Sequence, residues 1–393
     1  MKNNIISSYL QSKNFDIRKS HNGRWMDQKV TPDVLSLIAQ TILDYTENIN
    51  ENFTSKDLYQ SEDFLQTVAH FFGKPARAVG EMQNEYNKFV GQPLKTLTYA
   101  GLLLENQQKK PFVYSIDNKN ILELLAQSDR KSLLFLQGYI KKCLSDSGFD
   151  GIETFLSKKQ KSQDDFYILR DEFINFEINN TAINKELEPR RILAKVLNPL
   201  AFEANSQGAY RGHLSHANIR PIDLTYEGDN PQDAHKEKNM SRQEYRLAGN
   251  KYTLTYRIEK AIRAVRAYND KFNFGLSETG SGDQATQGHH MLPKAKTNYP
   301  QFSTYCENII MLSPNEHYLN AHKNNKTATI NFDYQKKLLL FKEANILNAI
   351  KNHPDESPYD YELFIKMITE YSCRENEPEI LKNVLKNAPP VYN

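Results

Sequence analysis

The sequence predicts an α+β protein that is mainly helical and divided into more than one domain. A chain of 393 residues exceeds what one core usually supports, so two or three separately buried units are expected. Apolar residues recur at helical spacing in much of the first 200 residues, and a few short apolar runs bounded by polar segments predict β-strands.

The composition predicts a cytoplasmic protein without a membrane segment. No run of eighteen uncharged apolar residues occurs, and residues Met1 to Gln40 contain no basic-then-apolar leader. The three cysteines, Cys143, Cys306 and Cys373, lie far apart and form no C-x-x-C pair. We therefore expect neither a disulfide framework nor a four-thiolate zinc site.

Three helical segments are predicted before residue 102. Pro32 suits a first helical turn, and apolar residues follow at helical spacing from Asp33 to Asp44. A capping-type start at Thr54 opens a second segment that runs to Phe71. The third is expected to begin at Pro93 and to reach Leu102.

A β-hairpin is predicted next, because two apolar runs flank the polar residues Glu105 to Lys110. Helices followed by a hairpin is the order of a winged helix-turn-helix, which we expect over residues 1–118. Lys95, Lys109 and Lys110 would then contact DNA. The alternative is a small helical domain that docks on the rest of the chain, with these lysines in solvent.

Residues 119–200 are expected to form a helical middle region that ends in a turn at Glu188 to Arg191 and another short helix. From 201 to 250 the chain is polar and has no sustained periodicity, which is typical of a linker or an extended arm. Arg211 within it is a candidate phosphate contact.

The last predicted domain spans residues 251–393. Thr253 to Asp270 reads as one helix with Ile258, Ile262 and Val265 as its apolar stripe. The basic residues off the stripe are Arg257, Lys260, Arg263 and Arg266, of which Arg263 is a candidate DNA contact. Between residues 251 and 343, thirteen Lys and Arg stand against eight Asp and Glu, so this region would tolerate a polyanion.

Four of the ten histidines lie between Gln287 and His322. Neighbouring side chains of a strand point to opposite faces, so His289 and His290 should have different roles. One can face a metal ion while the other takes a proton from water, since an unperturbed imidazole has a pKa of roughly 6.5.

A second short strand is predicted from Glu307 to Leu312, followed by a helix that Ser313 caps and Pro314 begins. His317 then lies one turn into this helix. Strand, strand and helix would bring His289 and His317 to one ion. A structural zinc site and scattered surface histidines are the alternatives.

The order His-His, Asn308, then His317 nine residues later resembles the HNH family of ββα-metal nucleases. The resemblance implies that His289 and His317 bind the metal, that His290 is the general base, and that Asn308 ties the loop and orients the base. His322 would be a further ligand. His322 follows His317 by five residues, whereas relatives separate these two ligands by four. In an ideal helix, a spacing of five residues rotates the side chain of His322 by about 140° relative to that of His317.

The resemblance implies hydrolysis of phosphodiester bonds with one divalent ion per site, Mg²⁺ or, as a substitute, Mn²⁺. Three stretches are also similar to a group of bacterial type II restriction endonucleases with a C-terminal HNH domain: Arg24 to Val34, Asn84 to Gly101, and Pro300 to His322. This implies cleavage of double-stranded DNA at a short specific site by a homodimer, with a companion methyltransferase encoded nearby. The alternatives are a modification-dependent or low-specificity nuclease and a non-enzymatic winged-helix DNA-binding protein.

Overall fold

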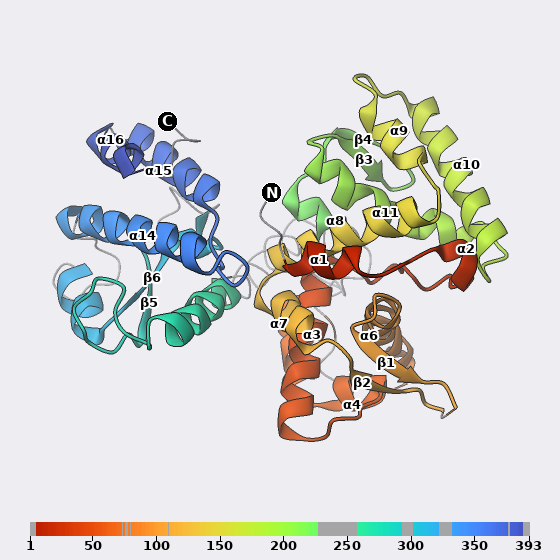
Figure 1. Ribbon diagram of the computed structural model, residues 1–393, viewed down its shortest axis with the longest axis horizontal. Helices are drawn as coiled ribbons and strands as arrows, with labels where there is room; N and C mark the ends of the chain where they lie inside the picture. The colour runs from red at the N-terminus through yellow and green to blue at the C-terminus, as the bar shows by residue number, and fades with distance from the viewer. Residues whose placement is uncertain are drawn as a thin grey trace, which may run out of the picture. The chain divides into compact units, whose positions relative to one another are not determined.

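The computed structural model describes residues 5–72, 74, 78, 80–108, 110–226, 258–292, 302–321, 332–375 and 378–387. Within these ranges the chain is mainly helical and carries three small antiparallel sheets of two strands each (Figure 1). The predicted mainly helical α+β composition is confirmed. The chain divides into two compact units, Met1–Gly249 (unit 1) and Asn250–Asn393 (unit 2).

Unit 1 is built mostly from helices, with two hairpins inserted among them. Its described elements are α1 (Ile5–Gln11), α2 (Ile17–Ser20), α3 (Pro32–Asn48), α4 (Ser55–Gln60), α5 (Glu62–Phe72), α6 (Glu81–Tyr99), β1 (Leu103–Asn106), β2 (Val113–Ile116), α7 (Lys119–Gln127), α8 (Asp129–Asp146), α9 (Gly151–Ser157), α10 (Gln163–Asn180), α11 (Leu187–Glu203), β3 (Gln207–Tyr210), β4 (His213–Asn218) and the 3₁₀ turn η1 (Pro221–Leu224).

Helix α3 is a central helix of unit 1. It begins where predicted, with Pro32 in its first turn, and its residues are buried nearly all round from Pro32 to Ala39. It packs against α7 and α8, and the Ser36 hydroxyl donates a hydrogen bond of 2.6 Å to the Leu125 carbonyl. Residues on both sides of the boundary expected at residue 118 therefore share one core.

The predicted capping start and hairpin are also present. Thr54 and Asp57 form a capping box at α4, and β1 pairs with β2 in the register Leu103 to Ile116. The prediction that a helix begins at Pro93 is wrong, because Pro93 lies inside α6. The apolar face that Leu94 continues already starts at the buried Tyr86, one turn after the helix begins.

Two further expectations for unit 1 are corrected. Glu188 to Arg191 do not form a loop but belong to the start of α11. The first backbone N–H groups of a helix have no acceptor within the helix, so the missing N–H of Pro189 costs no hydrogen bond there. The segment expected to be a linker or arm contains the hairpin β3–β4. Residues 227–250 of that segment lie outside the described residues.

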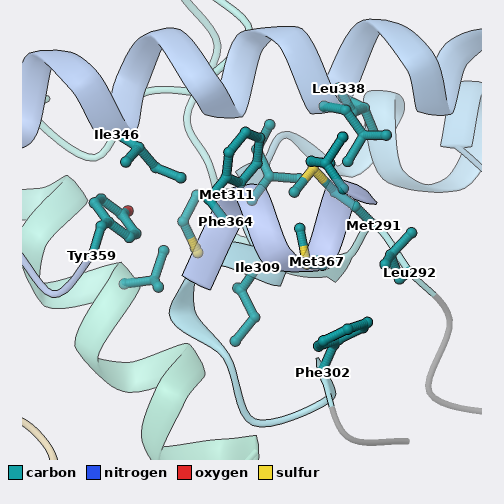
Figure 2. Close-up of a cluster of buried hydrophobic side chains, with 14 of the residues drawn as sticks. Met291, Leu292, Phe302, Ile309, Met311, Leu338, Ile346, Tyr359, Phe364 and Met367 are labelled. Carbon is teal, nitrogen blue, oxygen red and sulfur yellow. The ribbon is translucent and has the colours of Figure 1, made fainter. Parts of the chain in front are cut away.

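Unit 2 packs helices over one short hairpin. Residues 258–272 are helical, followed by β5 (Gln287–His290), the 3₁₀ turn η3 (Cys306–Asn308), β6 (Ile309–Leu312), the π-helical turn η4 (Glu316–Ala321), α14 (Phe332–Asn352), α15 (Tyr361–Glu375) and α16 (Pro378–Asn387). Figure 2 shows the core, where Leu338 and Ile346 of α14 approach Met311 of β6 together with Phe364 of α15. Lys260, expected off the apolar stripe, is buried.

Candidate functional site

The two adjacent histidines lie at the end of β5 and differ in exposure. Strand β5 pairs with β6, placing His289 opposite Ile310 and His290 opposite Ile309. His289 is only 3% exposed, whereas His290 is half-buried. The alternation of a strand therefore separates the two imidazoles, as the sequence predicted.

His317 of η4 brings a second imidazole to His289. The two ring centroids are 5.2 Å apart, and the ring planes are inclined at 76°. His289 Nε2 and His317 Nδ1 are both buried from solvent. A metal-bound imidazole nitrogen lies about 2.0–2.1 Å from its ion, so two rings that share one ion have centres roughly 5 Å apart. The observed spacing fits a shared ion.

A network of hydroxyl and amide donors fixes the turn that carries His317. Glu316 Oε2 accepts hydrogen bonds from the Ser313 amide at 2.9 Å and from the Ser277 hydroxyl at 2.6 Å, and the Thr279 hydroxyl also donates to this carboxylate. Burial acts to raise the pKa of Glu316, but these hydrogen bonds outweigh it and lower the pKa. An ionised Glu316 thus anchors the start of η4.

Asn308 is fully buried and ties the loop after β5 to the start of β6. Its Oδ1 accepts from the Leu292 amide at 2.7 Å, and its Nδ2 donates to the Leu292 and Phe302 carbonyls at 3.1 Å each. The Met291 amide adds a bond of 2.9 Å to the Asn308 carbonyl. The backbone that follows His290 is therefore held in one conformation.

The ring of His290 is oriented by a backbone carbonyl. Its Nε2 lies 3.0 Å from the Ser303 oxygen, and a carbonyl can only accept, so Nε2 carries the proton in this contact. In a neutral ring, Nδ1 is then the basic nitrogen. This tautomer suits a group that takes a proton from water.

The predicted DNA contacts are placed differently from one another. Lys95 pairs with Glu105 and lies 3.9 Å from the Phe112 ring centroid, so it joins α6 to the hairpin β1–β2. Lys110, Arg211 and Arg263 are exposed. Lys109 and the candidate ligand His322 lie outside the described residues.

Sequence reasoning identified Ser313 as a cap but missed Glu316 as its partner, together with the donors Ser277 and Thr279. The spacing Ser313-x-x-Glu316 is a capping-box pattern that predicts such a turn. Ser277 and Thr279 precede Glu316 by more than thirty residues, so only folding reveals that they donate to it. The Ser303 carbonyl gives no sequence signal at all, because every residue has one.

Comparison of the chain with protein-family models, with curated proteins and with solved structures gives no match. Among the described residues, no three or more His, Cys, Asp or Glu side chains are grouped to hold a metal ion. No helix in the described ranges is long and apolar enough to cross a membrane.

Proposed function

We propose that this chain is a metal-dependent DNA endonuclease of the HNH kind, acting as a type II restriction enzyme on double-stranded DNA. One observation carries the proposal. The rings of His289 and His317 meet at 5.2 Å, while His290, on the opposite face of the same strand, has its Nε2 on the Ser303 carbonyl. A pair of ligands and a separately oriented base are the parts that such hydrolysis needs.

Each of the described site residues would have a distinct role in hydrolysis. His289 and His317 would hold one divalent ion through ring nitrogens, with Mg²⁺ or Mn²⁺ as the expected metal. When bound, the ion stabilises negative charge that builds on the phosphate and the leaving oxygen. His290 would accept the proton of the attacking water at Nδ1, while its Nε2–H remains on Ser303. Asn308 positions His290 by fixing the backbone that follows it.

We infer that unit 1 reads the DNA through a winged-helix-like region within residues 1–118. Support comes from the hairpin β1–β2, which directly follows α6, and from exposed Lys110 beside its turn. The bond between Lys95 and Glu105 would hold this hairpin against α6 as one surface. The enzyme would act as a homodimer on DNA in a bacterial cytoplasm, with a companion methyltransferase that protects the host.

Digestion of plasmid DNA tests the proposal. Purified protein with Mg²⁺ is expected to give discrete fragments, and His290→Ala should slow cleavage by about 100-fold or more while binding persists. His353→Ala is the matched control, because this imidazole lies in unit 2 but stacks on Phe272, 3.9 Å between ring centroids. Equal cleavage by His290→Ala would refute the assigned base.

The same digestion separates the alternatives. A smear of fragments indicates a low-specificity nuclease, and cleavage of methylated DNA alone indicates a modification-dependent one. Retained binding without cleavage under any divalent metal indicates a non-enzymatic DNA-binding protein. Titration of the protein with Mn²⁺ by calorimetry tests the metal site independently of activity. Binding that survives His289→Ala and His317→Ala would contradict the assigned ligands.

A further inference from the structure

Phe274 in unit 2 combines two unfavourable features. Its side chain is 81% exposed, the highest value for a large hydrophobic residue among those that the structure describes. Its φ of 55° lies in the left-handed region, which a bulky side chain rarely adopts. A single exposed apolar residue is ordinary. Phe274, however, buries little apolar area, and its backbone conformation costs free energy, so the residue does not stabilise the fold.

The backbone on both sides of Phe274 is firmly held. Asn269 is buried, and its Nδ2 donates to the Leu276 carbonyl at 2.9 Å, while Asn273 Nδ2 donates to the same carbonyl at 3.0 Å. The Ala285 amide donates to the Gly275 carbonyl at 2.8 Å. The turn therefore presents the aromatic ring to solvent from a rigid support, at little further entropic cost on binding.

We propose that Phe274 stacks on a nucleobase of bound DNA, either between base pairs or on an unpaired base. This inference rests on the proposed nuclease function. The residues on either side of Phe274, Asn273 and Gly275, are polar or small, and the nearest apolar side chains in the chain, Phe272 and Leu276, are partly buried. A protein partner would need a wider apolar patch, whereas stacking needs only one ring face.

The helix that ends beside Phe274 also leads to the candidate site. Its exposed side includes Arg263 and Arg266, and Arg266 donates to the Thr286 carbonyl at 3.1 Å, immediately before β5. Lys271 is exposed as well, but it pairs with Glu356. Arg263 and Arg266 can meet phosphates along the same helix, so a DNA backbone that reaches His290 could pass within reach of Phe274.

Replacing Phe274 with tryptophan gives a direct test. The chain has one tryptophan, Trp25, which is fully buried, so a Phe274→Trp variant reports on position 274. With EDTA to prevent cleavage, duplex DNA should quench this emission and shield it from acrylamide. Ile49→Trp, at another exposed position, is the control and should show neither change.

Phe274→Gly supplies a second readout. Glycine accepts a positive φ, so this variant should unfold at the same temperature as the parent or higher, yet bind DNA about tenfold more weakly by fluorescence anisotropy. Unchanged Trp emission at saturating DNA, or unchanged affinity of Phe274→Gly, overturns the stacking role alone. If the tryptophan at position 274 is shielded from acrylamide without DNA, and the shielding increases with protein concentration, Phe274 contacts a second copy of the chain. That result also overturns the stacking role. Absence of any DNA binding overturns the nuclease proposal itself.

Discussion

Asn308 bonds both backbone groups of Leu292, accepting from its amide at 2.7 Å and donating to its carbonyl at 3.1 Å. The Asn308 side chain thus satisfies the backbone N–H and C=O groups of Leu292, as a neighbouring strand would do in a sheet. The loop that leaves β5 has its course fixed by these two bonds. The position of His290, at the end of β5, depends on the course of this loop.

Asn308→Ala is therefore expected to lower the free energy of unfolding by about 3 kcal/mol or more, because it leaves three buried backbone groups without their side-chain partner. Urea denaturation measures the loss. Asn345→Ala is the matched control in the same unit, where the amide donates one bond to the Glu278 carbonyl, and about 1 kcal/mol is expected. Equal losses would show that Asn308 has no special structural role.

The sequence predicted those parts of the fold that local patterns govern. Helix α3 follows from apolar spacing, the hairpin β1–β2 from two apolar runs around a polar segment, and the strand expected at His289 and His290 is present. The hairpin β3–β4 was missed because the exposed strand His213–Asn218 is polar and lacks an apolar alternation. The start of α6 was misplaced because Pro93 signals a helix start more strongly than it signals an interior residue.

Sequence reasoning selected the residues of the candidate site and two of their supports, Asn308 and Ser313, but not the other contacts that hold them. Spacing alone indicated that His289 and His317 could meet, since two strands and a turn have a small set of geometries. The contact of His290 with the Ser303 carbonyl and the hydroxyls on Glu316 depend on how loops return to the hairpin. Such long-range contacts leave no periodic signal in a single sequence.

A buried ion pair holds the hairpin β5–β6 to helix α14. Lys342 is fully buried and donates to Glu278 Oε1 at 2.8 Å, while Glu278 Oε2 accepts from the Met311 amide at 2.6 Å. Lys342→Met should destabilise the protein by about 3–5 kcal/mol, because it leaves the buried carboxylate of Glu278 without its counter-ion.

Urea denaturation of three variants tests this. Lys342→Met, Glu278→Gln and the double variant are compared with the parent, and the double variant should recover part of the loss because no charge remains buried. A double variant no more stable than Lys342→Met would argue that packing, not charge, dominates at this position.

Glu177 gives unit 1 a predictable pH dependence. Burial raises its pKa to about 7, although the Trp25 Nε1–H bond of 2.9 Å opposes the shift. Between the ordinary pKa of 4.5 and 7, the folded state keeps a proton that the unfolded state has lost. Stability should therefore fall as pH rises through this window, by roughly 3 kcal/mol in total.

Unfolding in urea at pH 5, 6, 7 and 8, followed by the fluorescence of buried Trp25, measures this slope. Glu177→Gln keeps an oxygen for the Trp25 bond but cannot ionise, so its stability should change less with pH. The exposed Glu203→Gln is the control and should keep the parent slope. A Glu177→Gln variant with an unaltered pH dependence would assign the slope to other groups.

The turn of the hairpin β3–β4 carries a residue that its geometry disfavours. Arg211 and Gly212 join the strands with φ of 51° and 81°, and such turns prefer Asn-Gly. The guanidinium of Arg211 lies 5.2 Å from the Tyr210 ring centroid, and both side chains are exposed. Because asparagine tolerates the left-handed region, Arg211→Asn should stabilise the protein by a few tenths to about 1 kcal/mol.

If Arg211 contacts a phosphate, the same change should weaken DNA binding. It should also reduce the slope of the logarithm of the binding constant against the logarithm of the salt concentration by about one. Thermal unfolding and anisotropy at several salt concentrations measure the two effects, with Arg190→Asn, an exposed arginine of α11 paired with Glu186, as the charge-matched control. Equal affinities for the two variants would remove Arg211 from the DNA surface and leave its left-handed conformation without a functional reason.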